Sequence, residues 1–307
     1  MNPIIETHSL NRRFGRTEAV RELTFQVPEG SIYAFLGPNG AGKTTTIKML
    51  LNILQPTTGT ARILGVDSRN LGPHELAQIG YVSENQQLPE WMTVRQLIDY
   101  CKPMYPTWDD AFCEKLLKNF GLLPHRKLKN LSRGMKVKAA LVTSLAYRPR
   151  LLVLDEPFSG LDPLVRDEFI RGMLELSEQS AWTIFISSHD IDEVERLADW
   201  VGVINDGQLH LSEPTESLQK RFRQIEFTVN AEITRLPATL PTTWLIPEMA
   251  GQNVRLVESQ FREGDTVNEL RRIFPGASEP TITPLSLRDI FLALAKTFRF
   301  KTESSKA

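Results

Sequence analysis

The sequence lacks the features of a membrane-spanning, secreted or nucleic-acid-binding chain. It has no run of about 18 apolar residues, so we expect no transmembrane helix. The first ten residues contain no apolar segment of the signal-peptide kind. The two cysteines, Cys101 and Cys113, are too few for a disulfide framework, and we expect reduced thiols. A net charge of −1 creates no global field that would attract nucleic acid.

Short apolar strands alternate with helical segments along the first two thirds of the chain. Residues 31–36 and 151–154 are almost continuously apolar, which is typical of strands covered on both faces. Asn205-Asp206-Gly207 between two apolar runs predicts a hairpin. Apolar residues at helical spacing predict helices at residues 43–54 and 190–198. This alternation indicates an open α/β sheet.

Two other regions interrupt this pattern. Residues 88–148 are expected to be largely helical, with helices at about 91–100, 109–120 and 132–147. After about residue 221 the strands become alternating and prolines cluster, which indicates a small α+β appendage. We therefore expect an α/β domain at 1–220 with a helical insertion, followed by an accessory domain at 221–307.

A glycine-rich loop follows the apolar strand at residues 31–36 and matches the pattern G-x-x-x-x-G-K-[ST]. Backbone N–H groups of such a loop, at the start of a helix, can surround phosphate groups. Lys43 is expected to reach the β- and γ-phosphates, and the Thr44 hydroxyl to bind Mg²⁺. The expected nucleotide-binding residues of the loop are Gly37, Asn39, Gly40, Ala41, Gly42, Lys43, Thr44 and Thr45.

Two carboxylates end the apolar run at residues 151–154, at the edge of the sheet where ligands of open α/β proteins bind. Asp155 is expected to hold Mg²⁺, and Glu156 to polarise the attacking water as a general base. A phosphate loop with such acids indicates the P-loop NTPase fold. Taken alone, the two acids would more often be solvated side chains of a turn, and the phosphate loop beside them favours the catalytic interpretation.

The run Leu131-Ser132-Arg133-Gly134-Met135 resembles the signature motif of ABC transporter ATPases, normally L-S-G-G-Q. Arg133 and Met135 depart from that pattern, whereas Ser132 and Gly134 keep it. Ser132 is well suited to cap the helix that follows. The resemblance implies that Ser132 and Gly134 address the γ-phosphate of ATP bound by the other subunit of a dimer.

Further positions match the same family. Ser159-Gly160-Leu161-Asp162 resembles the D-loop, His189 resembles the switch histidine that contacts the γ-phosphate, and Phe14 matches the aromatic residue that stacks on adenine. Glu84 stands where the family normally has the Q-loop glutamine. It is a candidate Mg²⁺ ligand or a solvated acid, and Gln86 or Gln87 could replace it by a shift of the loop.

The resemblance covers roughly residues 1–220 and implies an ATP- and Mg²⁺-dependent ATPase subunit of an ABC transporter. Catalysis would depend on Glu156, His189 and Lys43. The Tyr105–Asp109 stretch and the stretch around Ser286 resemble type-two exporter ATPases of the YtrB- and bacitracin-resistance-type subgroup. The implied partners are a separately encoded membrane permease and a second ATPase subunit, identical or different, on the cytoplasmic face of the cell membrane.

Three alternatives stay open at the level of sequence. A soluble ABC ATPase acting on ribosomes or DNA is disfavoured by the single phosphate loop and the near-zero net charge. A P-loop kinase or GTPase is disfavoured by the signature-like run and His189. A binding module without catalysis is suggested by the departures at Glu84, Arg133 and Met135.

Overall fold

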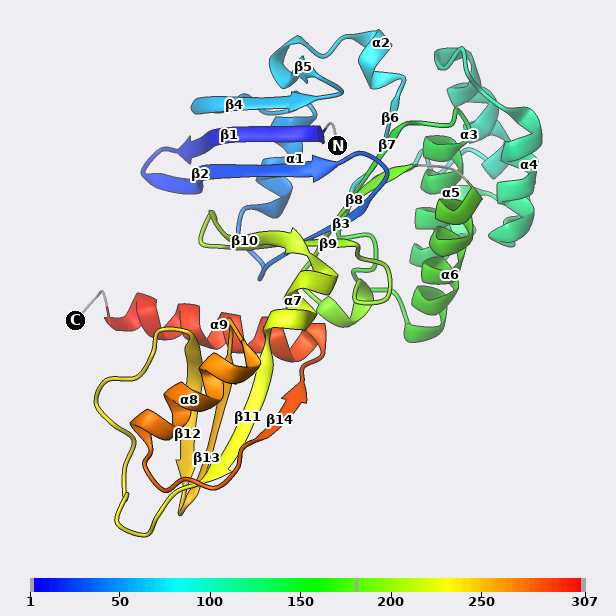
Figure 1. Cartoon of the computed structure of the whole chain (residues 1–307). Coiled ribbons are helices and arrows are strands. Elements are labelled where there is room, and N and C mark those ends of the chain that lie inside the picture. Colours follow the sequence, from blue (N-terminus) through cyan, green and yellow to red (C-terminus); the bar gives the residue numbers. More distant parts are fainter. Residues whose placement is uncertain (1–2, 180–181, 305–307) are drawn as a thin grey trace. The chain divides into compact units, whose positions relative to one another are not determined.

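The computed structural model describes residues 3–179 and 182–304, and the chain divides into two compact units, Met1–Ser212 and Glu213–Ala307 (Figure 1). The helix α7 (Thr215–Arg221) lies in the second unit. The domain limits predicted from the sequence, 1–220 and 221–307, stay a prediction. None of the described helices is long and apolar enough to cross a membrane.

A six-stranded sheet of order β10-β9-β3-β8-β7-β6 forms the centre of the first unit. The strand pairs β9–β3, β3–β8, β8–β7 and β7–β6 are all parallel. The strands of this sheet are β3 (Ile32–Leu36), β6 (Ile79–Val82), β7 (Leu151–Asp155), β8 (Thr183–Ser188), β9 (Trp200–Asn205) and β10 (Gln208–Pro214). Every residue of β3, β7 and β8 is buried, as their apolar composition predicts.

The predicted hairpin between β9 and β10 is confirmed. Asp206 and Gly207 form its loop with φ of 48° and 77°. Two-residue hairpin loops favour positive φ at both positions, because this backbone matches the twist of the flanking strands.

A second, antiparallel sheet of order β2-β1-β4-β5 belongs to the same unit. Its strands are β1 (Pro3–Phe14), β2 (Thr17–Pro28), β4 (Thr58–Ile63) and β5 (Val66–Asp67). The helix α1 (Lys43–Leu50) contacts strands of both sheets, and its Ile47 is fully buried in their common core. Phe25 of β2 stacks on Phe35 of β3 with ring centroids 5.5 Å apart. This packing fixes the start of α1, where the phosphate loop ends.

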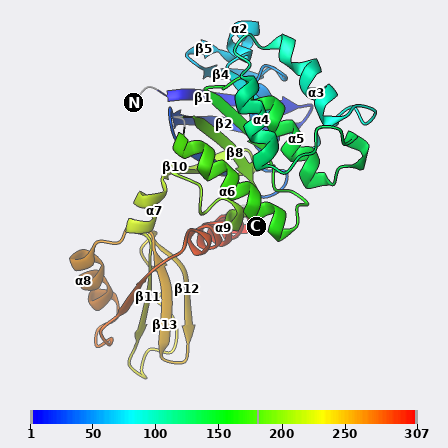
Figure 2. The same cartoon turned by 90° about the vertical axis from the view of Figure 1, so that its right-hand side faces the viewer.

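The predicted helical insertion is present, and side-chain caps define where its helices begin. They are α3 (Val94–Cys101), α4 (Asp110–Asn119) and α5 (Arg133–Leu145), after the short α2 (Pro73–Leu76). Thr93, Asp109 and Ser132 each accept a hydrogen bond from the backbone N–H three residues further on. Such caps satisfy N–H groups that have no partner within the helix. Figure 2 shows α3, α4 and α5 as neighbours.

The helix predicted at residues 190–198 is wrong. This segment forms only the 3₁₀ turn Ile191–Glu193 followed by further turns. Its charged side chains pair with α6 (Pro163–Gln179), a helix that we did not predict from the sequence. Arg196 pairs with Asp167, and Glu193 pairs with Arg166. These tertiary ion pairs, together with burial of Val194, override the local helical periodicity.

The second unit is an antiparallel sheet of order β12-β13-β11-β14 with its own core. Its elements after α7 are β11 (Arg223–Thr228), β12 (Trp244–Ala250), β13 (Asn253–Glu258), α8 (Glu263–Ile273), β14 (Thr281–Pro284) and α9 (Leu287–Ser304). Leu270 of α8 and the following Phe274 pack with Phe227 and Trp244 in this core. The α+β character matches the sequence expectation.

Candidate functional site

The glycine-rich loop between β3 and α1 depends on glycine at positions where the backbone passes other backbone closely. A Cβ atom at Gly37 would lie 2.2 Å from the Ile204 carbonyl oxygen, and one at Gly42 would lie 2.5 Å from that of Ala19. Gly40 and Gly42 have φ of 83° and 105°, which side chains rarely permit. The loop therefore cannot keep this shape with larger residues at these positions.

Lys43, the first residue of α1, has its ammonium group buried beneath this loop. Its side chain is only 6% exposed, and Nζ donates to the carbonyl oxygens of Gly37 at 2.6 Å and Pro38 at 3.1 Å. Nζ also lies 3.0 Å from Oε1 of Glu156. The loop thus binds its own lysine, and this lysine pairs with the carboxylate that follows β7.

Asp155 ends β7 with its carboxylate held by hydroxyl groups from two other elements. Oδ1 accepts a hydrogen bond from Ser187 Oγ at 2.7 Å and one from Thr44 Oγ1 at 3.1 Å. Burial raises the pKa of Asp155, the two hydrogen bonds counter this rise, and the charges of Glu156 and Glu84 reinforce it. An oxygen cluster of this kind is suited to a hard cation.

Glu156 joins Lys43 to His189. It is 6% exposed and has φ of 50°, a left-handed conformation that is costly for a residue other than glycine. Its N–H donates to Ser187 Oγ at 3.0 Å. Oε2 lies 2.7 Å from His189 Nδ1, and because a carboxylate only accepts, Nδ1 carries the proton. The structure therefore brings Lys43, Glu156 and His189 together at the carboxyl ends of the strands.

Ser187 is a member of this cluster that we did not identify from the sequence. Its hydroxyl bridges the Asp155 carboxylate and the Glu156 N–H. Asp155 and Ser187 are register partners on adjacent parallel strands. The signal was available, because Asp155 ends one apolar strand and Ser187 lies next to the end of another, but it could be used only once β7 and β8 were known to be neighbours.

Comparisons with known proteins agree with this geometry. Residues 20–159 match the family model described as ABC transporter. The chain is 34% identical to the bacitracin transport ATP-binding protein BcrA of Enterococcus faecalis, over 75% of this chain and 76% of that protein. It is 26% identical to the ABC transporter ATP-binding protein YtrB of Bacillus subtilis (strain 168), over 75% of this chain and 78% of that protein.

A solved structure of an ATP-binding subunit of an ABC transporter is 27% identical, with a TM-score of 0.63 over 71% of this chain and 92% of that one. The chain belongs to the ABC transporter ATPase family. This ABC ATPase is an ATP-binding subunit of a transporter and hydrolyses ATP. The P-loop NTPase fold and the ATP cofactor predicted from the sequence are thereby confirmed.

Glu84 follows β6 and lies close enough for its charge to raise the pKa of Asp155. Its Oε1 accepts a hydrogen bond from Ser159 Oγ at 3.3 Å, within the segment that resembles the D-loop. Gln86 and Gln87, the alternatives for this role, are exposed. Glu84 is thus attached to the turn that follows Glu156.

The signature-like run lies at the start of α5. Ser132 Oγ accepts from the Met135 N–H at 3.3 Å, as a cap does. A Cβ atom at Gly134 would lie 2.6 Å from Cγ1 of Val165, and one at Gly160 would lie 2.6 Å from Nη1 of Arg133. Within the described ranges, neither Ser132 nor Gly134 forms a hydrogen bond or ion pair with the Lys43 cluster. The structure of one chain does not bring these residues together with the phosphate loop.

Phe14, the expected adenine-stacking residue, ends β1 and is 46% exposed. The Arg12 guanidinium lies over that ring at 4.5 Å from the centroid. A cation on one face of an aromatic ring leaves the other face available for stacking.

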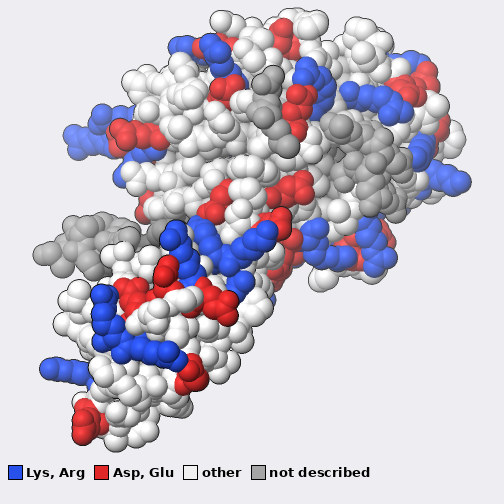
Figure 3. Space-filling model, viewed as in Figure 1, with Lys and Arg blue, Asp and Glu red and all other residues white. Residues whose placement is uncertain are grey.

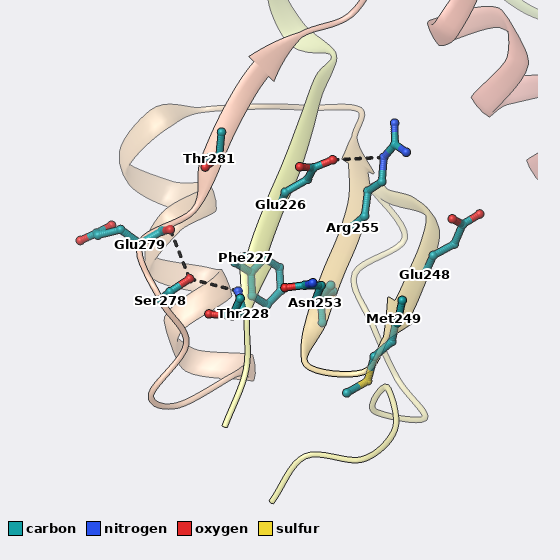
Figure 4. Close-up of a pocket in the computed structure, with 12 residues that line it drawn as sticks. Glu226, Phe227, Thr228, Glu248, Met249, Asn253, Arg255, Ser278, Glu279 and Thr281 are labelled. Carbon is teal, nitrogen blue, oxygen red and sulfur yellow. Dashed lines mark hydrogen bonds and ion pairs between the residues drawn. The ribbon is translucent and has the colours of Figure 1, made fainter. Parts of the chain in front are cut away.

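A hollow of about 660 Å³ lies on the sheet of the second unit (Figure 4). Its polar side chains are all exposed, and they are Glu226, Thr228, Glu248, Asn253, Arg255, Ser278, Glu279 and Thr281. Glu226 pairs with Arg255 at 3.4 Å. On the face drawn in Figure 3, Lys and Arg side chains lie among Asp and Glu side chains. The hollow is an open polar face of the sheet and contains no buried, unpaired group.

Proposed function

We propose that the cluster of Lys43, Asp155, Glu156 and His189 is the hydrolytic site of this ABC ATPase. The observation that carries this proposal is the chain of buried contacts from Lys43 through Glu156 to His189. When ATP binds, the Lys43 ammonium exchanges the Glu156 carboxylate for phosphate oxygens. Glu156 then keeps His189 as its partner and is available to accept a proton from the attacking water. Hydrolysis of this kind depends mainly on positioning and on charge stabilisation.

The oxygen donors of Thr44 and Asp155 fit Mg²⁺ bound together with the phosphates of ATP. Mg²⁺ in nucleotide sites uses one or two protein ligands, water and phosphate oxygens rather than a protein cage. In keeping with this, the described residues contain no group of three or more His, Cys, Asp or Glu that could hold a metal alone. Mg²⁺ would neutralise phosphate charge at this site. Glu84, whose charge acts on Asp155, is a further candidate ligand.

We propose that Ser132 and Gly134 act on ATP bound by a second ATPase subunit, so that ATP closes a dimer and hydrolysis reopens it. ATPases of this family dimerise and work with membrane permease subunits. The separation of Ser132 and Gly134 from the Lys43 cluster within one chain supports action between subunits. The exposed Ser132, together with Gly134, would then meet nucleotide only in the assembled site, whereas Phe14 would stack on the adenine of ATP bound by its own subunit. The dimer is formed by identical or by different subunits.

We propose a location on the cytoplasmic face of the cell membrane, bound to a separately encoded permease, and transport in the direction of export. Export is supported by the resemblance of the Tyr105–Asp109 stretch to type-two exporter ATPases. Two relatives are the bacitracin transport ATP-binding protein BcrA and the probable multidrug ABC transporter ATP-binding protein YbhF of Escherichia coli (strain K12). The chain spans 76% of the former and 38% of the latter. The second unit, from Glu213, is proposed to be an accessory domain.

The test is Glu156→Gln, which removes the base but keeps the shape of the side chain. We expect nucleotide affinity to be retained and turnover to fall by about 10²–10⁴, the range for losing a general base. Solution mass with MgATP should show a dimer that persists. The control Glu216→Gln alters an exposed carboxylate of α7 and should behave as wild type. Normal turnover in Glu156→Gln, with no dimer, would refute the proposed site.

A further inference from the structure

The segment that carries His189 is attached to α6 through a buried carboxylate. Glu193 is 3% exposed, and its Oε1 lies 3.1 Å from Nη2 of Arg166. Its other oxygen, Oε2, accepts a hydrogen bond from Ser188 Oγ at 2.6 Å. A single carboxylate thus binds the residue before His189 on one side and a helix distant in sequence on the other.

Arg166 also reaches the residue after His189. Its Nη1 lies 3.7 Å from Oδ2 of Asp190. The Asp190 N–H donates to Ser188 Oγ at 3.0 Å. Ser188 and Asp190, the two neighbours of His189, are therefore both connected to Arg166, directly or through Glu193. These contacts replace the regular helix that the sequence had indicated for residues 190–198.

Arg166 lies in the first turns of α6, and that helix follows the segment that begins at Glu156. Asp162 Oδ1 accepts from the Val165 N–H at 3.0 Å and so caps the start of α6. The Leu161 N–H donates to the Phe158 carbonyl oxygen at 3.0 Å, and the Ser159 N–H donates to the Glu156 carbonyl oxygen at 3.1 Å. The chain after Glu156 and the chain after His189 are consequently joined by the Arg166 contacts.

From this geometry we infer that Arg166 is a positioning residue that holds His189 against Glu156. The inference rests on the hydrolytic role proposed for Glu156 and His189. Among the described residues, Arg166 forms no hydrogen bond or ion pair with Lys43, Glu156 or His189 themselves, so its effect reaches the site through Ser188, Asp190 and Glu193. A displacement of about 1 Å in a catalytic group can cost about 100-fold in rate.

A purely structural role makes a different prediction. Removal of Arg166 leaves Glu193 buried without its cation, and such a loss destabilises a protein in any case. The double variant Arg166→Met/Glu193→Gln removes the unpaired charge and should recover most of the thermal stability. It does not restore the link from α6 to the segment of His189, so turnover should remain low.

The experiment measures kcat, the affinity of a fluorescent ATP analogue and Tm for each variant. We expect Arg166→Met to lower kcat about 10- to 100-fold and to leave nucleotide affinity nearly unchanged, because the phosphate loop is not touched. The matched control is Arg171→Met, the same substitution at an exposed ion pair of the same helix. It should leave kcat at the wild-type level.

A double-mutant cycle with His189→Ala decides how Arg166 acts. If Arg166 works through His189, Arg166→Met should cause no further loss of kcat in the His189→Ala background. An equal loss in both backgrounds, or a return of kcat together with Tm in Arg166→Met/Glu193→Gln, would overturn the inference. Full turnover in His189→Ala would instead refute the proposed role of His189. If kcat falls in His189→Ala but not in Arg166→Met, the proposed role of His189 stands and only the positioning role of Arg166 is rejected.

Discussion

At the scale of single residues, Asp155 illustrates the conflict between binding a cation and folding without one. Its carboxylate is buried and accepts hydrogen bonds from Ser187 and Thr44. Burial nevertheless dominates and raises the pKa of Asp155 above its ordinary value. The folded protein therefore holds this proton more tightly than the unfolded chain does. The stability contributed by protonated Asp155 is present at low pH. It is lost as pH rises from the pKa of Asp155 in the unfolded chain through its higher pKa in the folded protein.

Asp155→Asn should stabilise the nucleotide-free protein at neutral pH while abolishing hydrolysis. The Asn carbonyl can accept the same two hydrogen bonds without carrying a charge. We expect Tm at pH 7 to rise, because folding no longer buries a carboxylate charge; each gain of about 1 kcal/mol corresponds to about 2–4 °C in a unit of this size. The gain should shrink as pH falls, because the wild-type carboxylate then becomes protonated.

Thermal unfolding of wild type and Asp155→Asn between pH 4 and 8, without nucleotide, provides the measurement. Asp110→Asn changes an exposed aspartate and should show no such dependence on pH. A lower Tm for Asp155→Asn at neutral pH would mean that the two hydroxyl groups favour the charged form more than burial opposes it.

Most of the residues in this site could be named from sequence because each follows a short motif. Lys43 and Thr44 directly follow a glycine-rich loop, and Asp155 and Glu156 directly follow an apolar run at residues 151–154. Ser187 and Arg166 could not be found in this way. Their roles depend on which strand or helix lies beside β7 and β8, and no local pattern encodes that neighbourhood.

At the scale of elements, the sequence predicted the capped helices α3, α4 and α5, missed α6, and failed at residues 190–198, where tertiary charge pairs take over. The helices α3, α4 and α5 begin beside Thr93, Asp109 and Ser132, as the cap residues indicate. The segment 190–198 has helical spacing of apolar residues, but its charged side chains pair with α6. A helix at this position would have to break these pairs.

The contact between α5 and α6 is close because Gly134 has no side chain. Gly134→Ala would place a Cβ atom 2.6 Å from Cγ1 of Val165, a stiff β-branched neighbour. Overpacking of this kind costs about 1–3 kcal/mol, which exceeds the gain of about 0.8–1 kcal/mol from replacing glycine by alanine within a helix. We expect a net decrease in the free energy of unfolding, measured by urea denaturation.

The partner substitution Val165→Ala should relieve this clash, so Gly134→Ala/Val165→Ala should be more stable than additivity predicts. Gly264→Ala is the matched control, since the Gly264 position in α8 has no atom within 4 Å of a Cβ. It should stabilise the protein by about 0.4–1 kcal/mol. Stabilisation of similar size by Gly134→Ala would show that α5 and α6 can separate at little cost.

At the scale of the whole molecule, the chain has two compact units with separate apolar cores. The first core gathers Phe25, Phe35, Ile47 and Phe185 from both sheets and α1, and the second gathers residues such as Phe227 and Leu270. All the residues proposed to contact ATP or Mg²⁺ precede Ser212, the end of the first unit. Nucleotide should therefore stabilise the first unit alone.

Calorimetry of Glu156→Gln, which prevents turnover, should show two unfolding transitions. A ligand that binds only the folded state adds about 2.7 kcal/mol at 100 times its Kd. For a unit of roughly 200 residues this corresponds to about 5–10 °C. MgATP should shift one transition by this amount and leave the other at the temperature measured for the isolated fragment 213–307. If instead a single transition moves as a whole, the two cores unfold as one cooperative unit, and ATP stabilises the second unit through the first.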